Sequence, residues 1–281
     1  RHCNLVVISL GCLVAAVGAP DRTGQTKGTR MELARPASVR CDQTAKSSTE
    51  AVADGDFCRE CAVRDRAFCA ELGDDGLVQL DLMHAIVNLE EEETLFLEGD
   101  DAKAFFTLLS GALRISKLLP DGRRQIAGFL LPGDYAGLTI GDSYTYNAEA
   151  IAESTLCQFG RRDIEKFAAQ HRDMERRLLA MTNTNLVEAQ DHMLLLGRMN
   201  PMEKIASFLR GLSSRAIEVG RSSDPLFLPM SRSDIADYLG LTMETVSRTF
   251  TRLKRDGVIE LPEPNLVRIN DVARLAHLTE R

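Results

Sequence analysis

The 281-residue sequence lacks the motifs of several enzyme classes. It has no nucleophile elbow, no phosphate-binding loop and no paired-carboxylate site, so we do not expect an enzyme. It also lacks a clear membrane span, because its most apolar run, residues 5–19, is only 15 residues long. The cysteine count of seven is odd, which argues against a simple disulfide framework.

The chain has no excess of positive charge, since its net charge is −7 at pH 7. The charge is unevenly spread, however. Residues 71–101 contain eleven acids and no Lys or Arg, whereas residues 242–255 contain four basic residues and one acid. Binding responds to the local field, so an acidic chain can dock on DNA through residues 242–255. The composition, 44% hydrophobic and 27% charged, is typical of a globular protein with two domains and a linker.

Residues 231–260 are predicted to form a helix-turn-helix. Ser231 and Asp234 match a capping box that starts a first helix. Gly240 stands where the chain must turn, in a left-handed conformation that glycine adopts easily. Thr242 can cap a second helix. The apolar residues fall on one face of each helix: Ile235, Ala236, Leu239, Val246, Phe250 and Leu253.

The opposite face of the second helix carries polar side chains that suit DNA: Glu244, Ser247, Arg248, Arg252 and Lys254. Near its start, the Glu244 carboxylate can accept from cytosine and the Ser247 hydroxyl can bond to any base. The Arg248 guanidinium can donate two hydrogen bonds to guanine. An ordinary helical hairpin with a solvated charged face is the alternative. The agreement of caps, glycine, apolar core and polar face favours DNA binding.

A wing is predicted beyond the second helix. A turn at Asp256 and Gly257 leads into two short strands, residues 258–261 and 266–269. A small hairpin in this position can touch phosphates beside the groove.

Residues 77–160 alternate short apolar runs with turn signals. Evenly spaced strands of this kind predict an antiparallel double-sheet roll, with strands at residues 94–97, 105–109, 113–118, 125–130 and 148–159. A short helix at 163–167 and a long amphipathic helix at 174–198 follow, and Pro201 ends the latter. Such a helix needs a partner, which a symmetric dimer supplies; packing within the chain is the alternative.

Three cysteines follow a C-x2-C-x7-C pattern: Cys58, Cys61 and Cys69. Soft thiolates suit zinc or an iron–sulfur cluster, but either site needs a fourth ligand. Cys41 and Cys157 are the candidates, and Cys157 can equally be a small core residue of a buried strand. A redox dithiol at Cys58 and Cys61 would make the chain a thiol oxidoreductase, but no β-α-β pattern surrounds them. The scattered histidines, His84 among them, are expected at the surface or in helix packing.

The N-terminal 56 residues are interpreted as an extension. Residues 1–30 resemble a signal peptide but begin with Arg, and export would contradict a DNA-reading domain. We therefore interpret them as upstream read-through or a mis-set start, and expect a cytoplasmic protein. Residues 31–56 are predicted to be mobile. The expected domains are residues 57–170 for the cysteine loop and roll, 171–200 for the dimerisation helix, and 201–281 for DNA binding.

The cysteine run, Cys157 and residues 241–248 together resemble the CRP/FNR transcription regulators, over residues 57–280. The resemblance is greatest to the oxygen-sensing FNR branch, particularly FnrN/FixK-like members with the wider cysteine spacing. Glu244, Ser247 and Arg248 match the set with which that branch reads TTGAT half-sites. The resemblance implies an α+β fold with an N-terminal antiparallel β-roll of cyclic-nucleotide-binding type, a long dimerisation helix and a C-terminal winged helix-turn-helix.

The resemblance also implies the partners of the chain. It places a [4Fe–4S] cluster on Cys58, Cys61, Cys69 and Cys157, with Cys41 as a bystander. A homodimer forms when the cluster is intact, binds double-stranded DNA, and loses the cluster in oxygen. The turn that holds Asp121, Gly122 and Arg123 would contact RNA polymerase. A regulator with zinc on the same cysteines and no redox role is the alternative.

Two departures from the family pattern matter. The cyclic-nucleotide branch holds its phosphate with an Arg, and residues 133–148 contain none. A buried phosphate without a cationic partner is costly, so we expect no cyclic nucleotide. Ala189 stands where the enteric FNR protein has an acid that opposes association, so the dimer should be favoured here.

Overall fold

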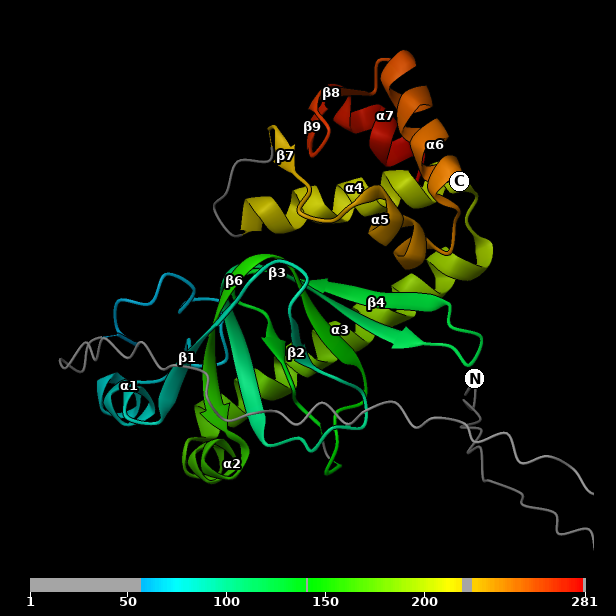
Figure 1. Ribbon diagram of the computed structural model, residues 1–281. Coiled ribbons are helices and arrows are strands. Elements are labelled where there is room, and N and C mark those ends of the chain that lie inside the picture. The colour runs from blue at the N-terminus through cyan, green and yellow to red at the C-terminus, as the bar shows by residue number, and fades with distance from the viewer. Residues whose placement is uncertain (1–56, 140, 219–223, 280–281) are drawn as a thin grey trace, which may run out of the picture. The chain divides into compact units, whose positions relative to one another are not determined.

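The computed structural model describes residues 57–139, 141–218 and 224–279, which belong to one compact unit (Figure 1). The predicted N-terminal extension, Cys41 included, lies outside the described residues. Among those described, no helix combines the length and apolar character needed to cross a bilayer.

The N-terminal half contains an antiparallel sheet built around two long strands. A short helix α1 (Asp74–Asp81) precedes it, and the strands are β1 (His84–Leu89), β2 (Thr94–Phe96), β3 (Ala104–Leu118), β4 (Arg124–Leu130), β5 (Tyr135–Ala136) and β6 (Asn147–Gly160). β3 and β6 pair from Ala104 opposite Gly160 to Ser116 opposite Asn147, and β4 and β1 flank them. Phe106, Leu113 and Leu156 lie in the apolar core of this sheet. The predicted antiparallel roll is confirmed.

Strand β3 differs from the expectation. A turn was expected at Ser110 and Gly111, but the strand continues through it with register shifts on both sides of Ser110. Gly111 has a φ of +87°, and a Cβ there would clash with Ser154. The glycine therefore permits a bulge that bends one long strand, where the sequence suggested two short ones. Helix α1 and strands β1 and β5 were not predicted from the sequence.

Three helices follow the sheet: α2 (Arg161–Gln170), α3 (Arg172–Arg198) and α4 (Pro201–Glu218). Helix α3 begins two residues before the predicted start, and Pro201 opens α4 at a position where its missing N–H costs nothing. Leu179, Leu186 and Met193 recur on α3 every seven residues and are 70%, 56% and 64% exposed. This apolar stripe is what a dimerisation helix requires.

The helix-turn-helix is α5 (Arg232–Leu239) and α6 (Met243–Arg255). Ser231 accepts a hydrogen bond from the Asp234 N–H, and the Asp234 carboxylate accepts one from the Ser231 N–H, which completes the predicted capping box. Gly240 is left-handed, with φ 60° and ψ 43°. Thr242 caps α6 by accepting from the N–H of Thr245. Each of these local predictions is confirmed.

A small sheet and a last helix complete the C-terminal half: β7 (Leu226–Phe227), β8 (Ile259–Glu263), β9 (Leu266–Ile269) and α7 (Val272–His277). The β8–β9 hairpin is the predicted wing, although β8 runs two residues beyond its expected end. Val246, Phe250 and Leu253 of α6 are buried in the core shared with α4 and α5.

Candidate functional site

Four cysteines from two distant segments form one cluster. Cys58, Cys61 and Cys69 lie in the loop before α1, whereas Cys157 lies on β6 opposite Ile86 of β1. All four thiols are free, and all but Cys61 are buried. Cys58, Cys69 and Cys157 share one apolar core. Cys157, which the sequence left open between ligand and core residue, therefore lies beside the loop cysteines.

The surroundings of the cluster favour protonated thiols. Burial raises the pKa of Cys58, and the neighbouring Asp81 carboxylate raises it further. Burial also raises the pKa of Cys157, and the nearby thiols of Cys58, Cys61 and Cys69 raise it further. Burial and Cys61 raise the pKa of Cys69 to about 11. A metal that binds here must displace protons, so its binding strengthens as the pH rises.

The spacing of the thiols bears on which group they fit. A single tetrahedral zinc, with Zn–S bonds near 2.3 Å, holds its sulfurs about 3.8 Å apart. Among the described residues, no three of the four thiols lie within 4.8 Å of one another. An iron–sulfur cluster is larger than one ion and is held by four thiolates. The donor set of four thiols fits a [4Fe–4S] cluster, and four thiolates can also hold a single zinc ion.

Two further ligand types, a carboxylate and an imidazole, lie beside Cys58 and were not predicted from the sequence as part of this site. The Asp81 carboxylate accepts the Cys58 N–H at 3.3 Å, and its Oδ1 lies 3.4 Å from Nδ1 of His84. Phe57 stacks on the His84 ring, with centroids 4.5 Å apart. His84, which was expected at the surface or in helix packing, is 15% exposed and contacts Asp81 at the end of α1. Only the D-x2-H spacing of Asp81 and His84 signals this contact in the sequence.

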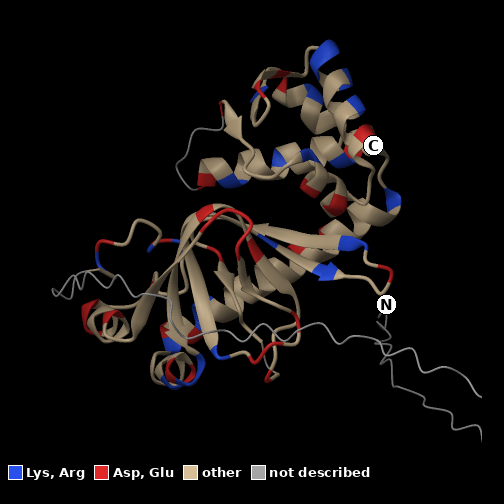
Figure 2. Cartoon of the chain, viewed as in Figure 1, with Lys and Arg blue, Asp and Glu red and all other residues tan. Residues whose placement is uncertain are grey.

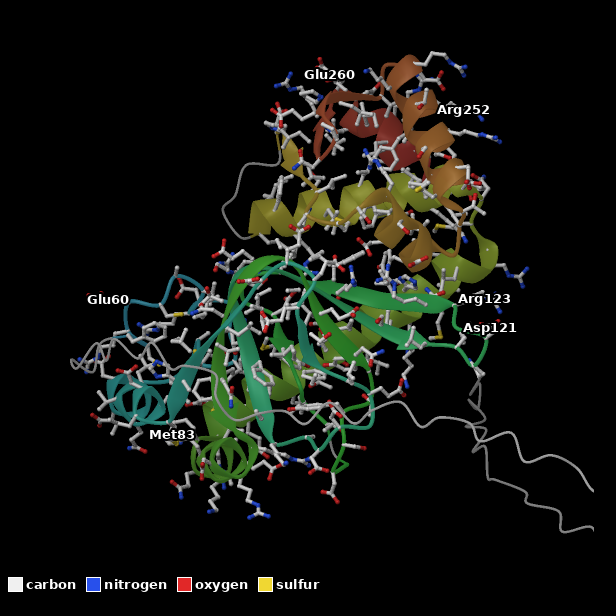
Figure 3. The ribbon with its side chains drawn as sticks, in the orientation of Figure 1. Glu60, Met83, Asp121, Arg123, Arg252 and Glu260 are labelled. Carbon is white, nitrogen blue, oxygen red and sulfur yellow. The ribbon has the colours of Figure 1, made fainter. Side chains whose placement is uncertain are left out.

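The predicted DNA contacts all lie on the exposed face of α6 or its cap: Thr242, Glu244, Ser247, Arg248, Arg252 and Lys254. Figure 2 marks basic residues in blue along this helix, and Figure 3 shows the Arg252 side chain extending away from it. A hydrogen bond from its own backbone N–H lowers the pKa of Glu244, assisted by the Thr242 hydroxyl and the charge of Arg248. Glu244 is therefore a charged acceptor in the first turn. The role of each residue in base reading stays a prediction.

A set of ion pairs, the hairpin clamp, joins the β3–β4 hairpin to α5. It consists of Arg114, Arg124, Asp234 and Asp237. Arg114 Nη1 and Arg124 Nη2 donate to Oδ1 of Asp234 at 3.3 and 2.8 Å, and Arg124 Nε donates to Asp237 at 3.0 Å. Asp234 is the residue that completes the cap of α5. The position of the first helix of the helix-turn-helix is thus fixed by the sheet.

The tip of the same hairpin carries Asp121, Gly122 and Arg123, the predicted polymerase contact. Arg123 Nε lies 2.8 Å from Asp121, and both side chains are more than half exposed. Figure 3 shows both residues at the end of the hairpin. They are accessible to a protein partner, and their role stays a prediction.

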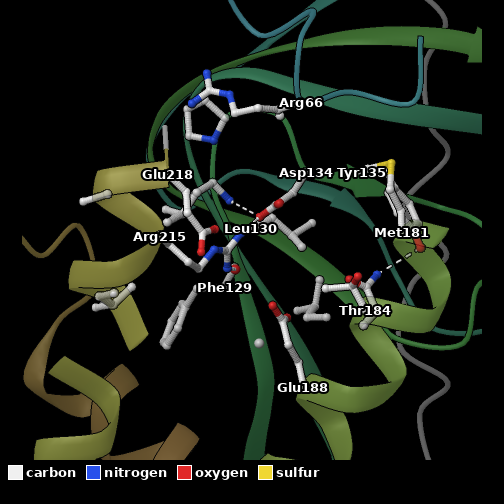
Figure 4. Close-up of a pocket in the computed structure, with 18 of the residues that line it drawn as sticks. Arg66, Phe129, Leu130, Asp134, Tyr135, Met181, Thr184, Glu188, Arg215 and Glu218 are labelled. Carbon is white, nitrogen blue, oxygen red and sulfur yellow. Dashed lines mark hydrogen bonds and ion pairs between the residues drawn. The ribbon is translucent and has the colours of Figure 1, made fainter. Parts of the chain in front are cut away.

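A cavity of about 760 Å³ lies between β4, α3 and α4 (Figure 4). Arg215 forms an ion pair with Asp134 inside it, and burial raises the pKa of the nearby Glu188. Ala189 also lines it. Three of residues 133–148, the stretch where the family would hold a cyclic phosphate, are part of its wall: Gly133, Asp134 and Tyr135. The expected absence of a bound cyclic nucleotide stays a prediction.

Comparisons with known proteins match both halves of the chain. The family model described as "Cyclic nucleotide-binding domain" matches residues 86–171, and "Bacterial regulatory proteins, crp family" matches residues 228–259. The Nitrogen fixation regulation protein FixK of Bradyrhizobium diazoefficiens is 44% identical over 208 residues, which cover 74% of this chain and 88% of that protein. The Transcriptional activator protein FnrL of Cereibacter sphaeroides is 36% identical over 222 residues, covering 78% and 90%.

A solved structure agrees with these matches. The structure of FixK2 from Bradyrhizobium japonicum is 38% identical, with a TM-score of 0.67, and the match covers 70% of this chain and 98% of that one. The sheet, the long helix α3 and the winged helix-turn-helix are the parts that the sequence resemblance implied. The chain belongs to the CRP/FNR family of transcription regulators, and it is a regulator of the FNR/FixK type.

Proposed function

We propose that this regulator responds to oxygen through a [4Fe–4S] cluster on Cys58, Cys61, Cys69 and Cys157. The observation that carries the proposal is the convergence of four free thiols from two segments 88 residues apart, counted from Cys69 to Cys157. When bound, the cluster supplies an oxygen-labile link between the four thiolates. Its loss would release the cysteine loop from β6.

The packing offers a route from the cysteine loop to α3. Cys58, Cys69 and Cys157 share their apolar core with Phe167 of α2 and Met174 of α3. In addition, Arg177 of α3 donates a hydrogen bond from Nη2 to the carbonyl of Arg66 in the loop, at 3.1 Å. A loop that is held against β6 would therefore also hold the first turns of α3.

Helix α3 would then pair with its copy in a homodimer. The stripe of Leu179, Leu186 and Met193 supplies the apolar contact, as in a two-stranded coiled coil. The dimer would place two copies of α6 in successive major grooves, about 34 Å apart, on a palindrome of TTGAT type. We infer a cytoplasmic activator that reaches RNA polymerase through Asp121, Gly122 and Arg123.

Purification without oxygen tests the proposal. We expect a brown protein with equal amounts of iron and acid-labile sulfide. On exposure to air, the visible absorbance should fall, and the protein should shift from dimer to monomer in size-exclusion chromatography. Zinc without sulfide in the anaerobic protein would contradict the proposal and support the zinc-stabilised regulator.

A further inference from the structure

The described residues bring one group of three different ligand types close together. The sulfur of Cys58, a carboxylate oxygen of Asp81 and a ring nitrogen of His84 all lie within 4.8 Å of one another. Each residue comes from a different segment: the cysteine loop, the end of α1 and the start of β1. Met83, labelled in Figure 3, lies between the last two.

We propose that Cys58, Asp81 and His84 form a binding site for a single divalent transition-metal ion of zinc type. Zinc takes thiolate, imidazole and carboxylate ligands in tetrahedral sites, whereas calcium and magnesium prefer oxygen ligands alone. Three protein ligands leave the fourth position for water or for the half-buried thiol of Cys61. Binding converts the Cys58 thiol to a thiolate and releases its proton to solvent, with no change of oxidation state.

The neighbours of the three ligands hold them in place. His84 Nδ1 lies 2.7 Å from the Asp81 carbonyl oxygen, and Phe57 covers one face of the ring. The Cys58 N–H donates to the Asp81 carboxylate. The side chains of Asp81 and His84 are only 7% and 15% exposed. Contacts of this kind orient metal ligands and sustain their affinity.

The site shares Cys58 with the proposed cluster, and this part of the inference rests on the proposed function. One thiolate cannot serve both groups, so zinc and the cluster would exclude each other. The two also tie the loop to different places. The cluster links it to β6 through Cys157, whereas zinc would link it to the end of α1 through Asp81 and to the start of β1 through His84. Zinc would therefore hold the regulator in a form without the β6 link.

Cobalt(II) is the probe for this site, because it binds zinc sites and its bond to thiolate absorbs in the near ultraviolet. The full chain is stripped of metal under anaerobic conditions and titrated with cobalt. We expect one cobalt per chain, displaced by zinc. His84→Gln and Asp81→Asn should each weaken binding at least tenfold, and Cys157→Ala, the matched control, should change it less than twofold.

Two results would overturn the site. One is loss of cobalt binding in Cys157→Ala with full binding in His84→Gln, which would indicate a site made of thiols only. The other is the absence of saturable binding in the parent protein. His84→Cys guards against misfolding of the His84→Gln variant, since a cysteine there supplies a new ligand. It should restore binding and strengthen the thiolate band, and a failure to do so in a folded variant would count against His84 as a ligand.

Competition is tested separately by reconstitution with iron and sulfide. Preloaded zinc should slow cluster formation severalfold in the parent protein and have little effect in His84→Gln. Equal slowing in both proteins would contradict the competition. If no cluster forms in any protein while cobalt still binds through His84, the proposed function fails and the zinc site stands.

Discussion

The four-cysteine cluster and the hairpin clamp each join distant segments of the chain through buried side chains. They differ in whether their ionisable groups have partners of opposite charge. At the clamp, burial alone would lower the pKa of Arg114, but hydrogen bonds to Glu92 and Glu149 and the charge of Asp234 raise it overall. At the cluster, burial and the neighbouring acid or thiols all raise the pKa of Cys58 and Cys157.

The difference shows which site is complete on its own. Positive and negative groups of the clamp pair with one another, so the chain supplies everything that the contact needs. At Cys69 the one cation among the causes of the pKa shift is Arg64, and it makes the smallest contribution. Charged thiolates become favourable there only when a metal replaces their protons. We therefore expect the hairpin clamp to be a permanent contact. The cysteine site is conditional, because its thiolates depend on a bound metal.

The largest effect should come from removing a ligand of the conditional site. Cys58→Ala, Cys61→Ala, Cys69→Ala or Cys157→Ala should each abolish cluster binding, because three thiolates cannot supply four irons. Cys41→Ala is the control and should keep full iron and sulfide content. The readout is visible absorbance with iron analysis of the anaerobic protein. Full cluster content in Cys157→Ala would move the fourth ligand to Cys41.

Breaking the permanent site should destabilise the folded chain. Asp234→Ala leaves the buried guanidinium of Arg114 without one of its partners and removes half of the capping box. We expect a loss of about 3–5 kcal/mol in the free energy of unfolding, measured by urea denaturation. Arg123→Ala removes an exposed pair and should cost less than about 1 kcal/mol. Equal losses for the two variants would show that the clamp is not a buried network.

The recognition helix, which the clamp holds through α5, should separate base reading from phosphate contact. Arg248→Ala should cost about 1–3 kcal/mol on the specific site and relax preference at one guanine. Arg252→Ala is the matched variant and should weaken all sequences alike, lowering the salt slope by about one unit. Competition binding with half-site variants measures both. If Arg248→Ala weakens binding to all sequences equally and keeps the preference for guanine, Arg248 contacts a phosphate and not a base.

In the metal-free protein, the raised pKa of the buried thiols should make the free energy of unfolding depend on alkaline pH. The folded pKa of Cys69, about 11, lies above its ordinary value of 9.0. Between these values the unfolded thiol loses its proton while the folded one keeps it, so stability falls as the pH rises, by up to about 1.4 kcal/mol per pH unit. Cys69→Ser should lose about 1 kcal/mol less than the parent between pH 8 and 10 in urea denaturation. Parallel losses would show that this thiol is not shifted.

The smallest expected effect is that of cyclic AMP. A ligand must bind the folded state to stabilise it, and residues 133–148 offer no arginine to a phosphate. Neither the melting temperature nor the DNA affinity should change at millimolar cyclic AMP. A saturable rise in melting temperature would assign the chain to the nucleotide-binding branch of its family.

Local chemistry made the C-terminal half the easier part to predict. The Ser231–Asp234 box, Gly240 and the Thr242 cap each depend on residues within four positions, and each is found in the structure. The bulge at Gly111 was missed because a glycine beside a serine signals a turn equally well. The clamp was missed because Arg114 and Asp234 are 120 positions apart, and no spacing in the sequence reports such a contact.

The cysteine site was predicted only in part for the same reason. The C-x2-C-x7-C run is visible in the sequence, and the resemblance to the family added Cys157. Asp81 and His84 have no motif of their own, and they become neighbours of Cys58 only when the loop folds back against α1. That contact depends on tertiary packing between segments and not on the local conformational preferences of the residues.

The dual role of Asp234 narrows the amino acids that its position can tolerate. The cap of α5 alone would accept Glu or Gln as well as Asp at this third helical position. The contact with Arg114 and Arg124 requires a negative charge, which excludes Gln and Asn. A side chain that is 6% exposed leaves little room for the extra methylene of Glu. Asp alone satisfies all three conditions, so substitution here should fail in a screen that tolerates change at neighbouring Ser233.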